Sequence, residues 1–214
     1  MIDLGELYAP KGVKPIRSQL YQTGGSLIEV TSPAVEVVDV DYVKDIGSIT
    51  ISDDDAMLSN YITSATQYLE NWLGRAFITQ TWKWTRGIRD FLERNEIPRP
   101  PLQKVSSLTY MNTLGVETTI DPNLYTVDTL NQPGVIWLKT TYVWPITLMN
   151  AAYYAYYIVN FDCGYGDSAD DVPQQIKDAV ANTVVFWYEN RGTLPIPGSI
   201  TDVLTQYRIF DFKI

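Results

Sequence analysis

Apolar side chains recur at helical spacing after residue 52. Ser52 and Asp55 have the spacing of a capping box, and acidic residues here complement the positive end of a helix dipole. Gly74 suits the left-handed cap that ends a helix. The apolar face between these signals consists of Leu58, Tyr61, Ile62, Ala65, Leu69, Trp72 and Leu73. The pattern predicts a helix near residues 53–73.

The same spacing returns near the C-terminus. One stretch follows Pro173, a residue favoured in the first turn of a helix, and closes at Gly192. A shorter stretch begins at Ser199, with Asp202 completing a second capping-box pair. We expect helices near residues 173–191 and 199–208, packed with the first helix as a small bundle. The apolar stripe of the longer helix consists of Ile176, Val180, Thr183, Val184, Trp187 and Tyr188.

Residues 76–165 follow a different pattern, in which apolar and polar side chains alternate. Turn signals about every 10 residues suit an antiparallel sheet or a small sandwich. Gly115 fits the turn of a hairpin between two of the runs. The pattern predicts an antiparallel β-region inserted into the helical bundle, so the expected fold class is α+β. The runs are residues 77–85, 105–111, 116–120, 125–128, 135–139 and 151–163.

The two ends of the chain differ from this central domain, which we assign to residues 41–208. Residues 1–40 are punctuated by Pro and Gly and predict an extended arm that needs a partner surface, either its own domain or a neighbour. Residues 209–214 form a short tail in which Phe210, Phe212 and Ile214 alternate with polar residues. Such a tail either packs back into its own core or adds a strand to a partner's sheet.

Composition excludes many enzyme classes. The chain has no His and one Cys, Cys163, so it lacks a Ser-His-Asp triad, a Cys-His pair, a His-ligated zinc and a CxxC site. We expect no enzymatic activity, no cofactor and no metal. The net charge of −9 argues against a basic nucleic-acid footprint. We find neither a secretory pattern nor an apolar run of about 18 residues, and we expect no membrane contact.

Clustered carboxylates raise two further candidates. The three aspartates at 53–55 are the residue type that binds hard cations, although a helix start accounts for all three. Glu93 with Glu96, or Asp162 with Asp167, have the residue type of a glycosidase pair. Sequence alone does not place either pair at the separation that glycoside cleavage needs.

Aromatic residues make up 13% of the chain, a level typical of both interfaces and β-rich cores. Tyr153, Tyr154, Tyr156 and Tyr157 place rings on both faces of the last predicted strand. That is unusual for a sheet with one face in water. Either both faces are covered within the chain or one face meets a partner, and we expect these tyrosines at an interface with another subunit.

Several short segments carry a resemblance to a known family. In order they are Val43-Lys44-Asp45, Tyr61-Ile62 with Ala65, 74–81 (GRAFITQT), 101–110 (PLQKVSSLTY), 164–166 (GYG), 172–180 (VPQQIKDAV), 188–191 (YENR) and Tyr207-Arg208. Together they resemble the head–tail connector proteins of tailed bacteriophages, also called adaptor or head-completion proteins. The resemblance spans residues 43–208. The N-terminal arm and the tail after Arg208 depart from it, since many members lack them.

This resemblance implies a virion structural protein of the neck, at the head–tail junction, assembled in the host bacterial cytoplasm. Its copies would form a ring, usually a dodecamer, that docks under the portal protein and supports a stopper or tail-completion protein. Double-stranded DNA would pass through the channel without specific binding, and an acidic wall would repel its phosphates. The family's C-terminal region commonly reaches the portal. The predicted docking residues are therefore Tyr207, Arg208, Phe210, Phe212 and Ile214.

A second function from another class stays open at this point. Tyr and Trp platforms together with acidic residues also suit a carbohydrate-binding or glycoside-cleaving tail module. Nothing in the sequence pairs these residues at a fixed spacing. Saccharide hydrolysis or glycan binding by the purified protein would favour this alternative, whereas a ring formed with the portal would favour the connector.

Overall fold

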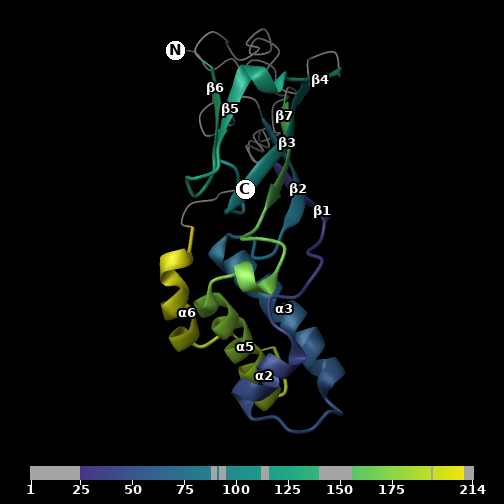
Figure 1. The fold of residues 1–214 in the computed structure, drawn as a ribbon, viewed down its shortest axis with the longest axis vertical. Coiled ribbons are helices and arrows are strands. Elements are labelled where there is room, and N and C mark those ends of the chain that lie inside the picture. The colour runs from purple at the N-terminus through teal and green to yellow at the C-terminus, as the bar shows by residue number, and fades with distance from the viewer. Residues whose placement is uncertain are drawn as a thin grey trace, which may run out of the picture.

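The computed structural model describes residues 25–87, 91, 95–111, 116–139, 156–193 and 195–209 of the chain. Its helices gather at one end of the long axis and the strands at the other (Figure 1). Each end has its own apolar core, one among the helices and one on the sheet. This arrangement of a helical bundle and an antiparallel sheet confirms the predicted α+β class.

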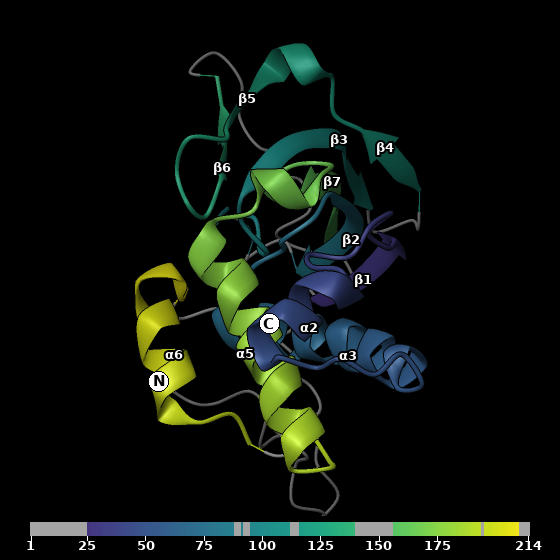
Figure 2. The same ribbon diagram turned by 60° about the horizontal axis from the view of Figure 1, so that its bottom comes forward.

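Helices α3 (Asp55–Leu73), α5 (Gln174–Glu189) and α6 (Gly198–Leu204) occupy the three predicted stretches, and a single 3₁₀ turn, η4 (Thr205–Tyr207), extends the last one. Helix α5 contacts each of the other helices, and α3 and α6 lie on opposite sides of it (Figure 2). The predicted stripes are the buried faces, because Leu58, Ile62 and Leu69 of α3 are fully or almost fully buried, as are Ile176 and Val184 of α5. Burial of these stripes against one another holds the bundle together.

A fourth helix, α2 (Val40–Gly47), falls outside the predictions from the sequence. The carboxylate of Asp39 caps it by accepting the backbone N–H of Tyr42 at 2.7 Å, and Val43 is fully buried. Val37 and Val38, just before the helix, also belong to the bundle core. The described part of the predicted arm therefore packs on its own domain, in this segment and in strand β1 (Ser26–Thr31).

The helix caps are only partly as predicted. Gly74 ends α3 in the left-handed region with φ of 69°, as predicted. The two predicted capping boxes are wrong, because α3 begins after Asp54 and α6 after Pro197, both without a side-chain cap. A capping box instead forms at Ser168, ahead of the single turn η3 (Ala169–Asp171), where local turn geometry rather than spacing alone brings the pair together.

The main sheet has five antiparallel strands in the order β1-β2-β7-β3-β4. Strand β7 (Tyr156–Cys163) lies at its centre, between β2 (Gln80–Gly87) and β3 (Leu102–Met111). Strand β4 (Glu117–Thr119) pairs with the end of β3, which confirms the predicted hairpin, whose turn residues 112–115 lie outside the described part. Strands β5 (Tyr125–Asp128) and β6 (Val135–Leu138) form a separate antiparallel pair after the single turn η1 (Pro122–Leu124).

The two faces of the main sheet have different characters. One face buries large side chains, among them Trp84, Leu108 and Phe161, and shares a core with Ile136 of β6. The opposite face carries mostly hydroxyl, amide and charged groups, because the pairing register aligns Lys83 with Asn160 and Thr81 with Asp162. The sheet therefore has one face turned to its own core and one polar face.

The bundle meets the sheet at a junction, called the waist below, where residues 74–79, 100–101 and 164–166 bond to one another beside the C-terminal end of α3. The backbone N–H of Tyr165 donates to the carbonyl of Phe77 at 2.8 Å, and that of Thr79 donates to the carbonyl of Gly166 at 2.9 Å. The N–H of Gly164 donates to the carbonyl of Pro101 at 2.9 Å. Gly164 has φ of 126° and lies so close to Ile78 that a Cβ would clash with its backbone. The segment 164–166 is thus a turn, as predicted.

Candidate interaction surfaces

A buried polar network occupies the bundle side of the waist. Glu70 of α3 is only 8% exposed, and its carboxylate accepts the backbone N–H of Phe77 at 2.7 Å and the side-chain amide of Gln80 at 2.9 Å. Gln80 in turn accepts the indole N–H of Trp82 at 2.8 Å. Burial raises the pKa of Glu70 from 4.5 to about 7, although these hydrogen bonds and the Arg99 charge oppose the rise.

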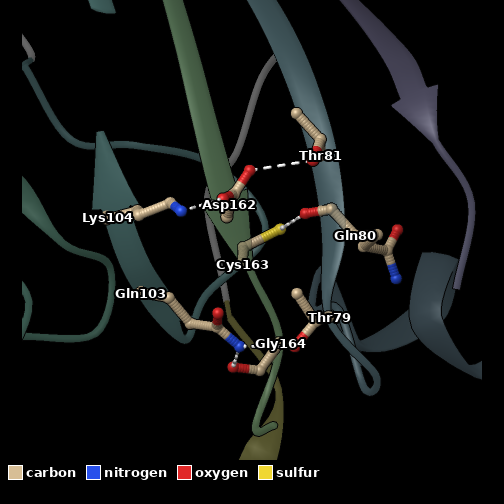
Figure 3. Close-up of polar contacts among 8 residues, drawn as sticks. All are labelled: Thr79, Gln80, Thr81, Gln103, Lys104, Asp162, Cys163 and Gly164. Atoms are coloured by element: carbon tan, nitrogen blue, oxygen red, sulfur yellow. Dashed lines mark hydrogen bonds and ion pairs between the residues drawn. The ribbon is translucent and has the colours of Figure 1, made fainter. Parts of the chain in front are cut away.

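The sheet side of the waist is held by polar contacts among β2, β3 and β7 (Figure 3). Asp162 accepts the hydroxyl of Thr81 at 2.8 Å and pairs with the ammonium group of Lys104 at 3.0 Å. Gln103 donates to the hydroxyl of Thr79 at 2.8 Å and to the carbonyl of Gly164 at 3.1 Å. These side chains bond to one another across the strands, so they fix the strands relative to one another.

Cys163 lies fully buried at the end of β7. Its Sγ contacts the carbonyl of Gln80 at 3.8 Å, and burial raises the pKa of the thiol far above its usual value (Figure 3). A thiol that stays protonated is a poor nucleophile. Cys163 therefore has the surroundings of a structural residue.

The carboxylates considered above as metal ligands or as a glycosidase pair either bond to other side chains of the chain or lie apart from one another. Among the three aspartates at 53–55, Asp55 pairs with Lys44 at 2.7 Å and Asp54 accepts the hydroxyl of Tyr188 at 2.8 Å. Within the described residues, no three Asp, Glu or Cys side chains come together as a metal site. Asp162 bonds to Thr81 and Lys104, Asp167 is exposed, and Glu93 lies outside the described residues.

The predicted docking residues divide into two groups. Tyr207 and Arg208 lie at the waist, whereas Phe210, Phe212 and Ile214 lie outside the described residues. The hydroxyl of Tyr207 donates to Gln175 of α5 at 2.9 Å. The guanidinium of Arg208 lies 4.6 Å from the ring centre of Trp72. Both residues are thus engaged within their own chain at the point where the tail begins.

The four predicted interface tyrosines are also divided. Tyr153 and Tyr154 lie outside the described residues. Tyr157 is fully buried in the sheet core, with its ring centre 4.6 Å from that of Phe91, so it packs within its own chain rather than on a surface. Tyr156 is half-buried and points to the polar face. The two described tyrosines therefore lie on opposite faces of the strand, as the alternation predicted, and the cover over Tyr157 comes from its own chain.

A groove of about 520 Å³ lies between α5 and α6. Its apolar lining includes Phe186, Ile200 and Val203, and its rim includes Asp178 and Glu189. Val203 is half exposed in this chain. Sequence reasoning missed this groove, because it arises from the angle at which α6 returns onto α5 rather than from either helix alone.

These features are paired polar groups, a buried thiol and a groove along α5. A model of the head completion protein family matches residues 36–194. The chain therefore belongs to the head completion protein family, which confirms the resemblance seen in the sequence. The family gives it a structural role in the connection between head and tail.

Solved structures show the same fold. One similar chain comes from the virion of a native gene transfer agent particle, with a TM-score of 0.67 and 19% identity over 87% of this chain and 96% of that chain. Two others come from necks of such particles. One, from an empty particle with C6 symmetry, has a TM-score of 0.64, 18% identity and coverage of 87% and 97%. The other, from a native particle with C12 symmetry, has a TM-score of 0.61, 19% identity and the same coverage.

No curated protein sequence matches the chain significantly. Among the described residues, no helix is long and apolar enough to cross a membrane.

Proposed function

We propose that this protein forms the ring-shaped connector, or adaptor, between the portal and the tail in the neck of a phage or phage-like particle. The family match carries the proposal, because residues 36–194 include the whole helical bundle except α6 and all the main-sheet strands except β1. The fold shared with chains from virion necks with C6 and C12 symmetry supports a ring of copies. A ring needs two different patches on each copy that repeat until they close.

In this proposal the ring docks under the portal through its C-terminal residues 207–214, extends the DNA channel and supports a stopper or tail-completion protein. The function is geometric and requires no catalytic group. The chain carries a net charge of −9, so a channel wall drawn from its acidic surface repels phosphates and lets DNA slide past. A map of the assembled ring tests this last point, and a channel lined mainly by Lys and Arg would refute it.

Electron microscopy of the purified chain mixed with portal rings tests the proposed function. We expect a second ring stacked coaxially on the portal, and portal rings alone provide the control. A chain that stays monomeric and adds no density to the portal would contradict the proposal. The comparisons give no support to a carbohydrate-active module, and saccharide hydrolysis by the same preparation would be needed to revive it.

A further inference from the structure

Helix α3 has an exposed side, its outer side, whose residues are all uncharged. The two charged residues of the helix are accounted for elsewhere, since Asp55 pairs with Lys44 at 2.7 Å and Glu70 is buried at the waist. A helix side in water ordinarily carries charged as well as polar residues, whereas the centres of protein interfaces are depleted of charge. The outer side of α3 consists of Ala56, Met57, Ser59, Asn60, Thr63, Ser64, Gln67, Tyr68 and Asn71.

Two large side chains stand out on this outer side. Met57 is 38% exposed and Tyr68 is 41% exposed. They are eleven positions apart, so they project from the same side of the helix about 16 Å apart along its axis. The ring of Tyr68 packs edge-on against that of Trp187 of α5, with 6.3 Å between the ring centres. Tyr68 is therefore held in place on the surface, which lowers the entropy cost of using it as a contact.

Charged groups from two other segments border the outer side of α3, and each is bonded to a residue of the helix. The hydroxyl of Thr63 donates to the carboxylate of Glu36 at 2.6 Å. The guanidinium of Arg99 donates to the side-chain oxygen of Asn71 at 2.5 Å. One of these groups is acidic and the other is basic, so together they add no net charge to the outer side.

The groove between α5 and α6 lies on the other flank of the bundle. Its lining along α5 runs from Gln175 to Glu189, which is about 21 Å of helix. The groove positions of α5, such as Asn182 and Phe186, lie away from the stripe that packs into the bundle core. Because α3 and α6 lie on opposite sides of α5, the groove and the outer side of α3 are two different patches on opposite flanks (Figure 2).

We propose that, in the ring, the outer side of α3 of one copy packs into the α5–α6 groove of the next copy. This inference rests on the proposed function, because a closed ring needs two different patches on each copy. The groove lining spans about 21 Å along α5, enough for the roughly 16 Å between Met57 and Tyr68. Its apolar residues, among them Phe186, Ile200 and Val203, suit these two side chains.

Charge favours this occupant of the groove. A net charge of −9 makes copies of the chain repel one another, and the groove rim carries Asp178 and Glu189. The uncharged outer side of α3 can approach this rim without like-charge repulsion, and the side-chain amides on it can donate to the carboxylates. By contrast, the exposed apolar residues Ile28, Val35 and Ile46 each directly adjoin an acidic residue in the chain.

Electron microscopy of variant chains mixed with portal rings tests this contact, with the wild-type chain as reference. Ser64 is exposed between Met57 and Tyr68 on the outer side of α3. We expect Ser64→Glu to reduce the share of portal rings that carry a second ring by about tenfold or more, because it sets an acid against the acidic rim at every junction. Ser64→Lys places a cation there instead and should retain the rings. Glu and Lys are both good helix formers, so neither variant should lower the melting temperature.

Val203→Glu tests the groove side of the same contact. Val203 is half exposed and lines the groove, so we expect the same loss of rings at an unchanged melting temperature. Ser106→Glu is the matched control, because Ser106 is an exposed serine of strand β3 in the sheet, away from both patches. This control should form rings as the wild type does.

The outcomes separate the contact from the proposed function. If the wild-type chain adds no ring to the portal, the connector function is refuted and the contact with it. If the wild type forms the ring and either Ser64→Glu or Val203→Glu forms it equally well, the pairing of these two patches is refuted and the connector function stands. Equal losses with Ser64→Glu and Ser64→Lys would refute the acidic groove as the partner of α3.

Discussion

Replacement of Glu70 by Gln should make the stability of the chain less sensitive to pH. Glu70 is buried at the waist, and its pKa of about 7 lies well above the 4.5 of an exposed glutamate. A native state that holds its proton more tightly than the unfolded chain loses stability as pH rises. The loss begins near pH 4.5, where the unfolded chain ionises, and is complete once the pH has passed about 7.

The size of the effect follows from the two pKa values. A pKa difference of one corresponds to about 1.4 kcal/mol. Between about pH 5 and about pH 8, Glu70 should therefore lower the free energy of unfolding by roughly 2 to 3 kcal/mol. Gln has nearly the same shape, and its side-chain oxygen can still accept from the N–H of Phe77 and the amide of Gln80. The Glu70→Gln variant should keep the network and lose this part of the pH dependence.

Urea unfolding of both chains across this pH range measures the effect. The informative quantity is the difference between wild type and variant at each pH, because contributions from other titrating groups cancel. Glu117→Gln on β4 is the control, since Glu117 is exposed and should leave the pH dependence as in wild type. Parallel pH curves for wild type and Glu70→Gln would show that the pKa of Glu70 is the same in the native and the unfolded chain, and the reasoning from burial would fail.

Three further changes test other parts of the fold. Gly74→Ala forces a residue with a Cβ into the left-handed region and should cost about 1 kcal/mol in urea unfolding, whereas an unchanged stability would contradict the strain argument. Tyr42→Phe removes the hydrogen bond from the Tyr42 hydroxyl to Asp178, so thermal melts at neutral pH should show a loss of about 1 kcal/mol. The same hydrogen bond raises the pKa of Tyr42. Wild type should therefore lose this stability as pH rises past about 10, and the variant should lose less. Leu69→Ala should cost about 2 to 5 kcal/mol, against little change for the exposed Ile51→Ala, and equal effects would argue against the proposed bundle core.

The long elements could be predicted from the sequence because their periodicity is a direct consequence of burial on one face. The stripe of α3 and the hairpin of β3 and β4 are cases of this kind. Helix α2 has eight residues, about two turns, and although Val40, Val43 and Ile46 recur at helical spacing, so short a stretch does not by itself establish a helix from periodicity. It depends on contacts from other helices, such as the bond between Tyr42 and Asp178, which are 136 positions apart.

The candidate surfaces were harder to predict for the same reason. The sequence placed Tyr207 and Arg208 among the predicted docking residues, but only the fold shows their contacts with Gln175 and Trp72. The bonds of Arg75 reach Gln132 and Tyr207 across 57 and 132 positions. A local pattern of apolar and polar residues cannot reveal contacts between residues so far apart in the sequence.

Three arginines of this acidic chain lie together at the waist. Arg75, Arg99 and Arg208 all lie near the C-terminal end of α3, where unpaired carbonyls and the helix dipole favour positive charge. Arg99 donates to Asn71 at 2.5 Å, and its guanidinium lies 5.1 Å from the ring centre of Trp82. Each of these cations is committed to a partner within the chain. Their clustering therefore reflects the junction between the bundle and the sheet, where each guanidinium stabilises a contact within the chain.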